Sequence, residues 1–99
     1  MNKTNNENLV NLIAAGQVSR VDGCINVIVS DEIGFTTRDT PAVADRIWGF
    51  SGDDNWWRME EEAVRFGIPT DQFWYVAEPA LTACVEADAA RIKTAKLVS

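Results

Sequence analysis

Two carboxylates fall among apolar residues in segments that the sequence predicts to be helical. Glu60 shares a helical side with Trp56 and Val64, and Asp88 shares one with Val85. A carboxylate in such a place must find a partner or take up a proton. Two of them facing one cavity could act as general acid and general base. The structural alternative is an arginine partner, or for Glu60 a position at the wet edge of the apolar stripe.

No other residues strengthen the case for catalysis. The chain has no histidine, so a serine or cysteine nucleophile would lack its usual base. Cys24 and Cys84 are too few and too far apart for a zinc site. There is no phosphate-binding glycine loop, no dinucleotide fingerprint, no zinc-protease motif and no calcium loop. We therefore expect no enzyme, no cofactor and no bound metal.

Acidic and aromatic residues gather in the middle of the chain. Eight of the nine aromatic residues fall between Trp48 and Tyr75. The formal net charge is -6, and residues 49–90 alone hold nine acids against two arginines. The last nine residues are basic, with three cations and no acid. A negative block repels nucleic acid and anionic lipid and attracts basic protein surfaces, although it also serves solubility alone.

We predict that part of this block binds a partner. The acids would attract it over a distance, and the indoles would hold the complex. The predicted partner-binding residues are Asp53, Asp54, Trp57, Glu60, Glu61, Glu62 and Trp74. Helical spacing pairs Arg58 with Glu62 and Arg65 with Glu61, which leaves Glu60 over. Core packing is the alternative role of each tryptophan.

These features favour a non-catalytic acidic protein that docks on a basic, nucleic-acid-binding surface of a larger protein and blocks it. In size, acidity and lack of catalytic motifs, the chain is similar to small phage-encoded inhibitors of host defence, such as anti-CRISPR and anti-restriction proteins, and to nuclease-immunity proteins. No shared motif carries this likeness. Direct nucleic-acid binding is disfavoured, because a recognition helix over residues 55–66 would present glutamates to phosphates. The alternative is an accessory subunit whose aromatic patch forms an oligomer interface, for example in a homodimer.

The length and composition of the chain limit the number of domains and the compartment in which these residues act. Ninety-nine residues predict a single domain over 1–99. The polar start predicts no export signal, and no apolar run approaches the roughly 20 residues of a membrane span. We expect a cytoplasmic protein with both cysteines reduced.

The hydrophobic pattern predicts an α+β domain, mostly helical, with four to five helices and a small two- or three-stranded antiparallel sheet near the N-terminus. A first helix over about 5–15 ends at Gly16. Branched residues predict a strand over 24–30 with flanking strands over 17–21 and 35–38. Asp22 and Gly23 supply the turn between the first two strands.

The remainder of the sequence is predicted to be helical. Pro41 would begin a helix that Gly49 ends, and a helix over about 55–66 ends at Gly67. The apolar side of the latter comprises Trp56, Trp57, Met59, Ala63, Val64 and Phe66. A short helix starts at Thr70. Pro79 either begins the last helix, over about 79–96, or kinks a continuous one.

Overall fold

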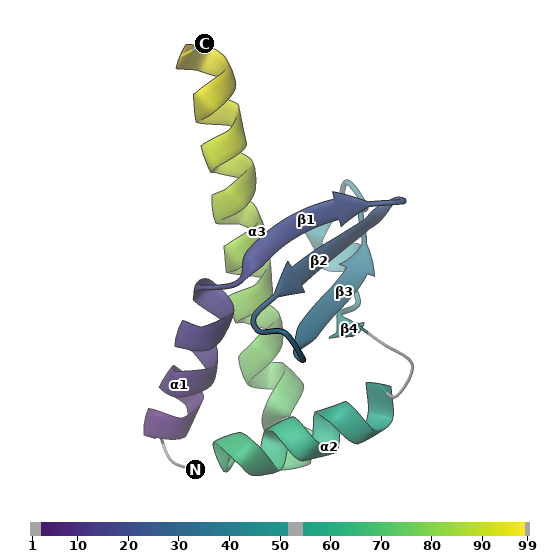
Figure 1. The fold of residues 1–99 in the computed structure, drawn as a ribbon, viewed down its shortest axis with the longest axis vertical. Coiled ribbons are helices and arrows are strands. Elements are labelled where there is room, and N and C mark those ends of the chain that lie inside the picture. The colour runs from purple at the N-terminus through teal and green to yellow at the C-terminus, as the bar shows by residue number, and fades with distance from the viewer. Residues whose placement is uncertain (1–2, 52–54, 99) are drawn as a thin grey trace.

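The computed structural model describes residues 3–51 and 55–98, with side chains described for 4–51 and 57–96 (Figure 1). These ranges hold three α-helices and one four-stranded antiparallel sheet. The elements are α1 (Lys3–Ala14), β1 (Gln17–Val21), β2 (Cys24–Ile28), β3 (Gly34–Arg38), β4 (Gly49–Phe50), α2 (Asn55–Phe66) and α3 (Phe73–Val98). Within these ranges, no helix combines the length and the apolar character that crossing a membrane would require.

The sheet is a meander in which each strand pairs with the next one in sequence, in the order β1-β2-β3-β4. Asp22 and Gly23 join β1 to β2, with φ angles of 53° and 76°. Positive φ at both central residues is what a two-residue hairpin turn with the native strand twist requires, and Asp-Gly accepts it readily. The three predicted strands and this turn are therefore confirmed.

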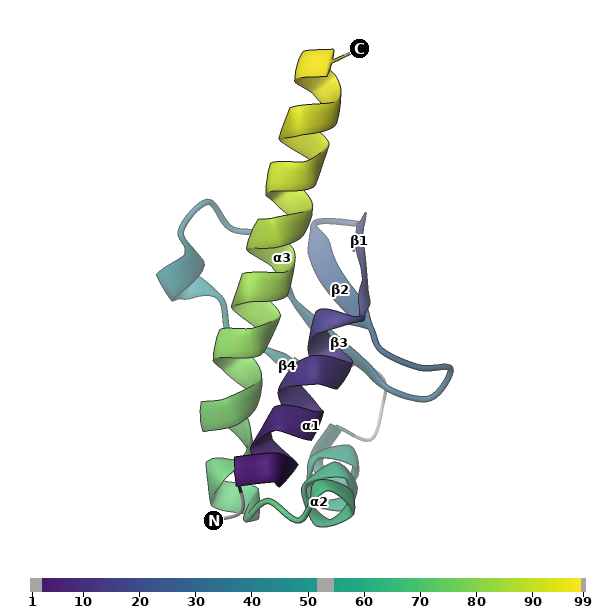
Figure 2. The same cartoon turned by 90° about the vertical axis from the view of Figure 1, so that its left-hand side faces the viewer.

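One core lies between the sheet and two helices, α1 and α3, which pack against each other (Figure 2). Alternate side chains of the strands enter it, because successive residues of a strand point to opposite faces. The core includes Leu9 and Ile13 of α1, Ile25, Val27 and Phe35 of the sheet, and Phe73, Ala77, Leu81 and Val85 of α3. Trp74 packs against Phe35 and Phe50, with ring centroids 6.0 and 5.5 Å away.

The molecule is an α+β domain, but the predicted four to five helices and two or three strands are wrong. The helix expected after Thr40 does not form: the segment contains a single 3-10 turn, Val43–Asp45, and then β4. Trp48 and Phe50 are both buried, and Phe50 stacks on Phe35 at 4.9 Å. Two aromatic residues with one glycine between them suit a strand, where positions i and i+2 share a face.

The end of the chain forms one helix, not two. Thr70–Gln72 is a 3-10 turn that leads directly into the 26 residues of α3, and Pro79 lies inside this helix. A proline costs its helix a hydrogen bond. Here Phe73, Ala77, Leu81 and Val85 are buried on both sides of it, so packing against the core holds the helix together.

Two predicted helix ends are confirmed, the one at Gly16 and the one at Gly67. Gly67 has a φ of 67°, and the amide of Ile68 donates to the carbonyl of Ala63 at 2.9 Å. Ile68 is buried beside this turn, as expected for a helix closed by a left-handed glycine. The helix α1 ends at Ala14, where the Gly16 amide donates to the Ile13 carbonyl.

The last turns of α3 project beyond the sheet (Figures 1 and 2). Every residue from 89 to 96 is exposed, whereas Leu81 and Val85 earlier in the same helix are buried. The buried side of α3 therefore ends at Val85, and Ile92 and Ala95 do not belong to the core.

Candidate functional site

The helix α2 packs on the domain through a narrow side. Ala63 is buried, and Met59 and Phe66 pack against the core. Glu62 lies on the same side and is only 5% exposed. These positions have the spacing of one helical face, and the small Ala63 side chain lets α2 approach closely.

The predicted apolar side of this helix is therefore wrong in part. Trp57 and Val64 belong to the predicted apolar side, but they are 63% and 78% exposed, and exposure is what the predicted partner-binding role of Trp57 requires. Glu62 occupies the inner side in their place. The sequence pattern covers half of the helix circumference. Among the side chains described for α2, the apolar contact with the core follows Met59, Ala63 and Phe66, and Trp57 and Val64 stay outside.

The exposed side of α2 is a candidate interaction surface. Trp57, Glu61 and Val64 follow each other at intervals of four and three residues, and all three are exposed. Glu60 is half-buried at its margin. We call the surface formed by Trp57, Glu60, Glu61 and Val64 the α2 outer face. Large exposed apolar side chains beside charged ones are typical of protein-binding sites.

A hollow of about 460 Å³ borders this face. Trp57, Arg58 and Glu61 line it from α2, and Glu32 lines it from the connection between β2 and β3. The Arg58 guanidinium donates to the backbone carbonyl of Glu32, which ties α2 to that connection. Glu32 was not among the predicted residues, because nothing in sequence spacing links residue 32 to residue 61.

The predicted ion pairs on α2 are replaced by a different one. Arg65 approaches Glu62 at 3.5 Å, three residues apart. Among the described side chains, neither Arg58 with Glu62 nor Arg65 with Glu61 lies within ion-pair distance. The cause is the rotation of the helix, which carries Glu62 inward and leaves Glu61 exposed.

Glu62 is separated from the acids that remain on the surface. Its Oε2 atom is buried and accepts no hydrogen bond from the described residues. Burial raises the pKa of Glu62, Arg65 opposes this and lowers it, and the charge of Glu61 raises it further. A carboxyl group held in this way lies in the contact of α2 with the rest of the domain and is not presented to a partner.

The other predicted residues are dispersed. Asp53 and Asp54 lie outside the described residues. Trp74 is half-buried in the aromatic cluster, edge-on to Phe73 with centroids 5.6 Å apart, and its accessible part belongs to α3 rather than to the α2 outer face. Its neighbour Tyr75 is 76% exposed. Residues next to one another on a helix point in different directions, so only one of the two aromatic rings can enter the core.

Asp88 has two arginine partners, one of the arrangements expected for a carboxylate on an apolar side. Its Oδ2 accepts a hydrogen bond from Nη1 of Arg20 at 2.9 Å, and its Oδ1 accepts one from Nη2 of Arg91 at 2.7 Å. These two hydrogen bonds, from Arg20 first and from Arg91 second, lower the pKa of Asp88. An ionised carboxylate bound by two guanidinium groups joins β1 to α3 and is a poor proton acceptor.

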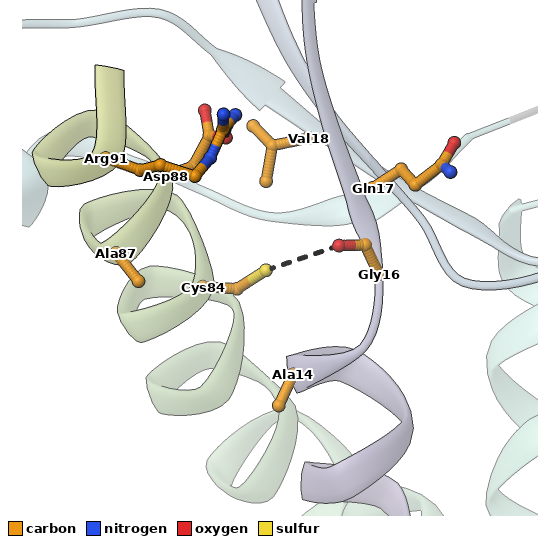
Figure 3. Close-up of a pocket in the computed structure, with 8 residues that line it drawn as sticks. All are labelled: Ala14, Gly16, Gln17, Val18, Cys84, Ala87, Asp88 and Arg91. Atoms are coloured by element: carbon orange, nitrogen blue, oxygen red, sulfur yellow. Dashed lines mark hydrogen bonds and ion pairs between the residues drawn. The ribbon is translucent and has the colours of Figure 1, made fainter. Parts of the chain in front are cut away.

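Asp88 lines a cavity of about 490 Å³ between α3 and the start of β1 (Figure 3). The Cys84 thiol points into it and lies 3.9 Å from the carbonyl oxygen of Gly16. Burial raises the pKa of Cys84, and the charge of Asp88 adds to the effect, so the thiol stays protonated and unreactive. Glu60 does not line this cavity, so the acid–base pair that we considered is not assembled there.

Both cysteines are free and half-buried. No three carboxylates or thiols of the described residues come together as metal ligands would. The chain matches no family model, and no curated protein or solved structure shows significant similarity to it. The function therefore has to be argued from the surface itself.

Proposed function

We propose that this chain is a non-catalytic binding protein that docks its α2 outer face on a basic surface of a larger protein and covers that surface. One observation carries the proposal: Trp57 and Val64 are exposed beside Glu61, while Met59, Ala63 and Phe66 join α2 to the core. Two large apolar side chains in water bring nothing to this fold. Against a partner they would leave water together, which favours binding.

The apolar and the acidic residues of this surface have different roles in the proposed binding. A tryptophan at the centre of an interface is a common hot spot, where truncation costs about 2 kcal/mol or more of binding free energy. Carboxylates at the edge contribute chiefly through the rate of association, because their field acts before contact. Trp57 and Val64 are therefore the anchor, and Glu60, Glu61 and Glu32 steer the partner towards it.

A basic partner suits the charge of this region. The nine acids and two arginines of residues 49–90 give the middle of the chain its negative charge. Surfaces that bind nucleic acid hold lysines and arginines spaced for phosphates, and carboxylates on a helix can meet the same cations. The same carboxylates repel nucleic acid itself. The proposed target is therefore a protein's nucleic-acid-binding surface.

The first prediction tests the anchor. In pull-downs from an extract of source cells, Trp57→Ala should lose the proteins that the wild-type chain retains specifically. Ile47→Ala is the matched control, because Ile47 is an apolar residue that is 83% exposed outside α2. Equal capture by Trp57→Ala and wild type would show that the α2 outer face is not the binding surface.

The second prediction concerns the charge of Glu61. It is tested by the association rate with a protein captured in the pull-down. Glu61→Lys should slow association by about tenfold or more at low salt, and the difference should shrink as salt screens the field. Stopped-flow or surface-based kinetics across a salt series measure this. Association rates that do not respond to salt in either chain would remove the electrostatic part of the proposal.

A further inference from the structure

A second surface, on α3, has a charge pattern that the proposed function does not use. Six residues of α3, none of them buried, recur at intervals of three, four or seven residues. We call this line the α3 outer stripe, and it consists of Tyr75, Glu78, Thr82, Glu86, Lys93 and Lys96. Such spacing places side chains along one side of a helix.

The stripe is acidic in its first half and basic in its second. Glu78 and Glu86 precede Lys93 and Lys96, and all four residues are exposed. The first half also borders a groove of about 490 Å³, in which Pro79 and Ala83 provide apolar surface between the two glutamates and Tyr75 adds more one turn before Glu78. The acidic half therefore offers what a basic helix needs: carboxylates, and a shallow apolar seat between them.

The basic half contributes no described residue to the core of the single chain. Residues 89–96 are exposed on every side and project past the sheet (Figure 2). Short helices are marginal in water, and most helices in proteins are stabilised by packing of one side. Ala89 and Ala90 in this segment have small side chains, which would let a second helix approach closely.

We propose that a second copy of this chain packs antiparallel along the α3 outer stripe. The projecting end of each α3 then lies on the groove of the other copy, and Lys93 and Lys96 meet glutamates in both halves of the interface. A parallel arrangement would set like charges against each other and is disfavoured. The interface uses the same surface of both chains, as two-fold dimers do. It does not involve the α2 outer face and is independent of the proposed function.

Charge reversal on the stripe tests this dimer. We expect the wild type to dimerise in sedimentation experiments between about 1 μM and 1 mM at low salt. Glu78→Lys with Glu86→Lys, and separately Lys93→Glu with Lys96→Glu, should each raise the dimer dissociation constant by about tenfold or more. Mixing the two variants should restore a one-to-one dimer, because all contacts between them pair opposite charges.

Two further variants make the test specific. The control variant is Glu7→Lys with Asp39→Lys, at two exposed sites outside α3. It changes the net charge by the same amount as Glu78→Lys with Glu86→Lys and should leave dimerisation unchanged. The chain with all four stripe reversals should dimerise with itself but not with the wild type, because antiparallel pairing of those two chains opposes like charges. Mixing of these two chains would instead show a parallel pair.

Three results would overturn the proposal. A wild type that is monomeric at every concentration has no such interface. If the charge reversals on the stripe leave the dimer dissociation constant unchanged, or if Trp57→Ala abolishes the dimer, then the dimer is formed by another surface. Circular dichroism of each variant separates loss of pairing from loss of folding, and pull-downs with Trp57→Ala report on the α2 outer face separately.

Discussion

Glu62 is a carboxyl group on the inner side of an otherwise apolar contact. Burial raises its pKa above the ordinary value of 4.5, and the charge of Arg65 only partly offsets this. The folded chain therefore binds a proton at Glu62 more readily than the unfolded chain does. Protonation favours the fold, so this contribution is fully present below about pH 4.5 and is lost as the pH rises through the pKa of the folded state.

The residue-scale prediction is that Glu62→Gln stabilises the protein at neutral pH and not near pH 4. The gain is on the order of 1 kcal/mol or less, because the weak contact with Arg65 is lost at the same time. Urea unfolding at the two pH values measures it. The control is Glu61→Gln, a change on the exposed side of α2. The stability of this variant should equal that of the wild type at both pH values. A loss of stability in Glu62→Gln at neutral pH would contradict our account of Glu62.

Individual residues show where sequence reasoning succeeds. An arginine was one of the partners considered for Asp88, because a carboxylate on an apolar side must be compensated, and Arg20 and Arg91 provide this. For Trp57 the sequence leaves two roles open, core packing and partner binding, whereas it assigns Val64 to the apolar side alone. Hydrophobicity alone assigns both to the core, and only the packing of Ala63 and Met59 decides which edge of the helix stays outside.

At the scale of elements, Gly16 lies at the junction between α1 and β1. Of the described glycines without a positive φ, it has the least room for a side chain. A Cβ atom on Gly16 would lie 2.7 Å from Cγ1 of Val27 and 3.0 Å from the carbonyl oxygen of Ile13. Val27 is buried and has little freedom to move. The closeness of α1 to the sheet therefore depends on the missing side chain.

We predict that Gly16→Ala lowers the free energy of unfolding by about 1–3 kcal/mol through overpacking. Gly49→Ala is the matched control, because no atom lies within 4 Å of the Cβ that it would add. That variant should stay within about 0.5 kcal/mol of the wild type. Chemical denaturation of both variants measures these changes in the free energy of unfolding. An equal change at the two sites would mean that α1 can shift away from the sheet without loss of stability.

The elements that sequence reasoning found are those with local causes. The first three strands, the Asp22-Gly23 turn and the Gly67 stop all depend on neighbouring residues. The β4 strand has two residues and exists because Phe50 meets Phe35, which is distant in sequence. The continuity of α3 through Pro79 likewise depends on buried residues on both sides of it, which no local rule weighs.

At the scale of the whole molecule, α3 divides into a packed part and a projecting part. Leu81 and Val85 are buried in the first, whereas residues 89–96 are exposed throughout. Local opening costs least where few apolar contacts must break. The two parts of one helix should therefore differ in their stability.

Hydrogen exchange tests this division. In dilute protein, amides of residues 89–96 should exchange about 100-fold faster than those of residues 77–85. If the α3 dimer forms, protection of residues 89–96 should rise with protein concentration, while residues 77–85 change little. Equal protection of both parts in dilute protein would mean that the projecting end is stable without any partner.

The order of strands in the sheet has a consequence for how the chain acquires its fold. Two, five and ten residues separate successive strands, so each pairing closes only a short loop at a small entropic cost. The packing of α1 against α3 joins the two ends of the chain and cannot occur until the last segment has been synthesised. A nascent chain on the ribosome would hold an early meander with Val27 and Phe35 uncovered, and the arrival of α3 would complete folding.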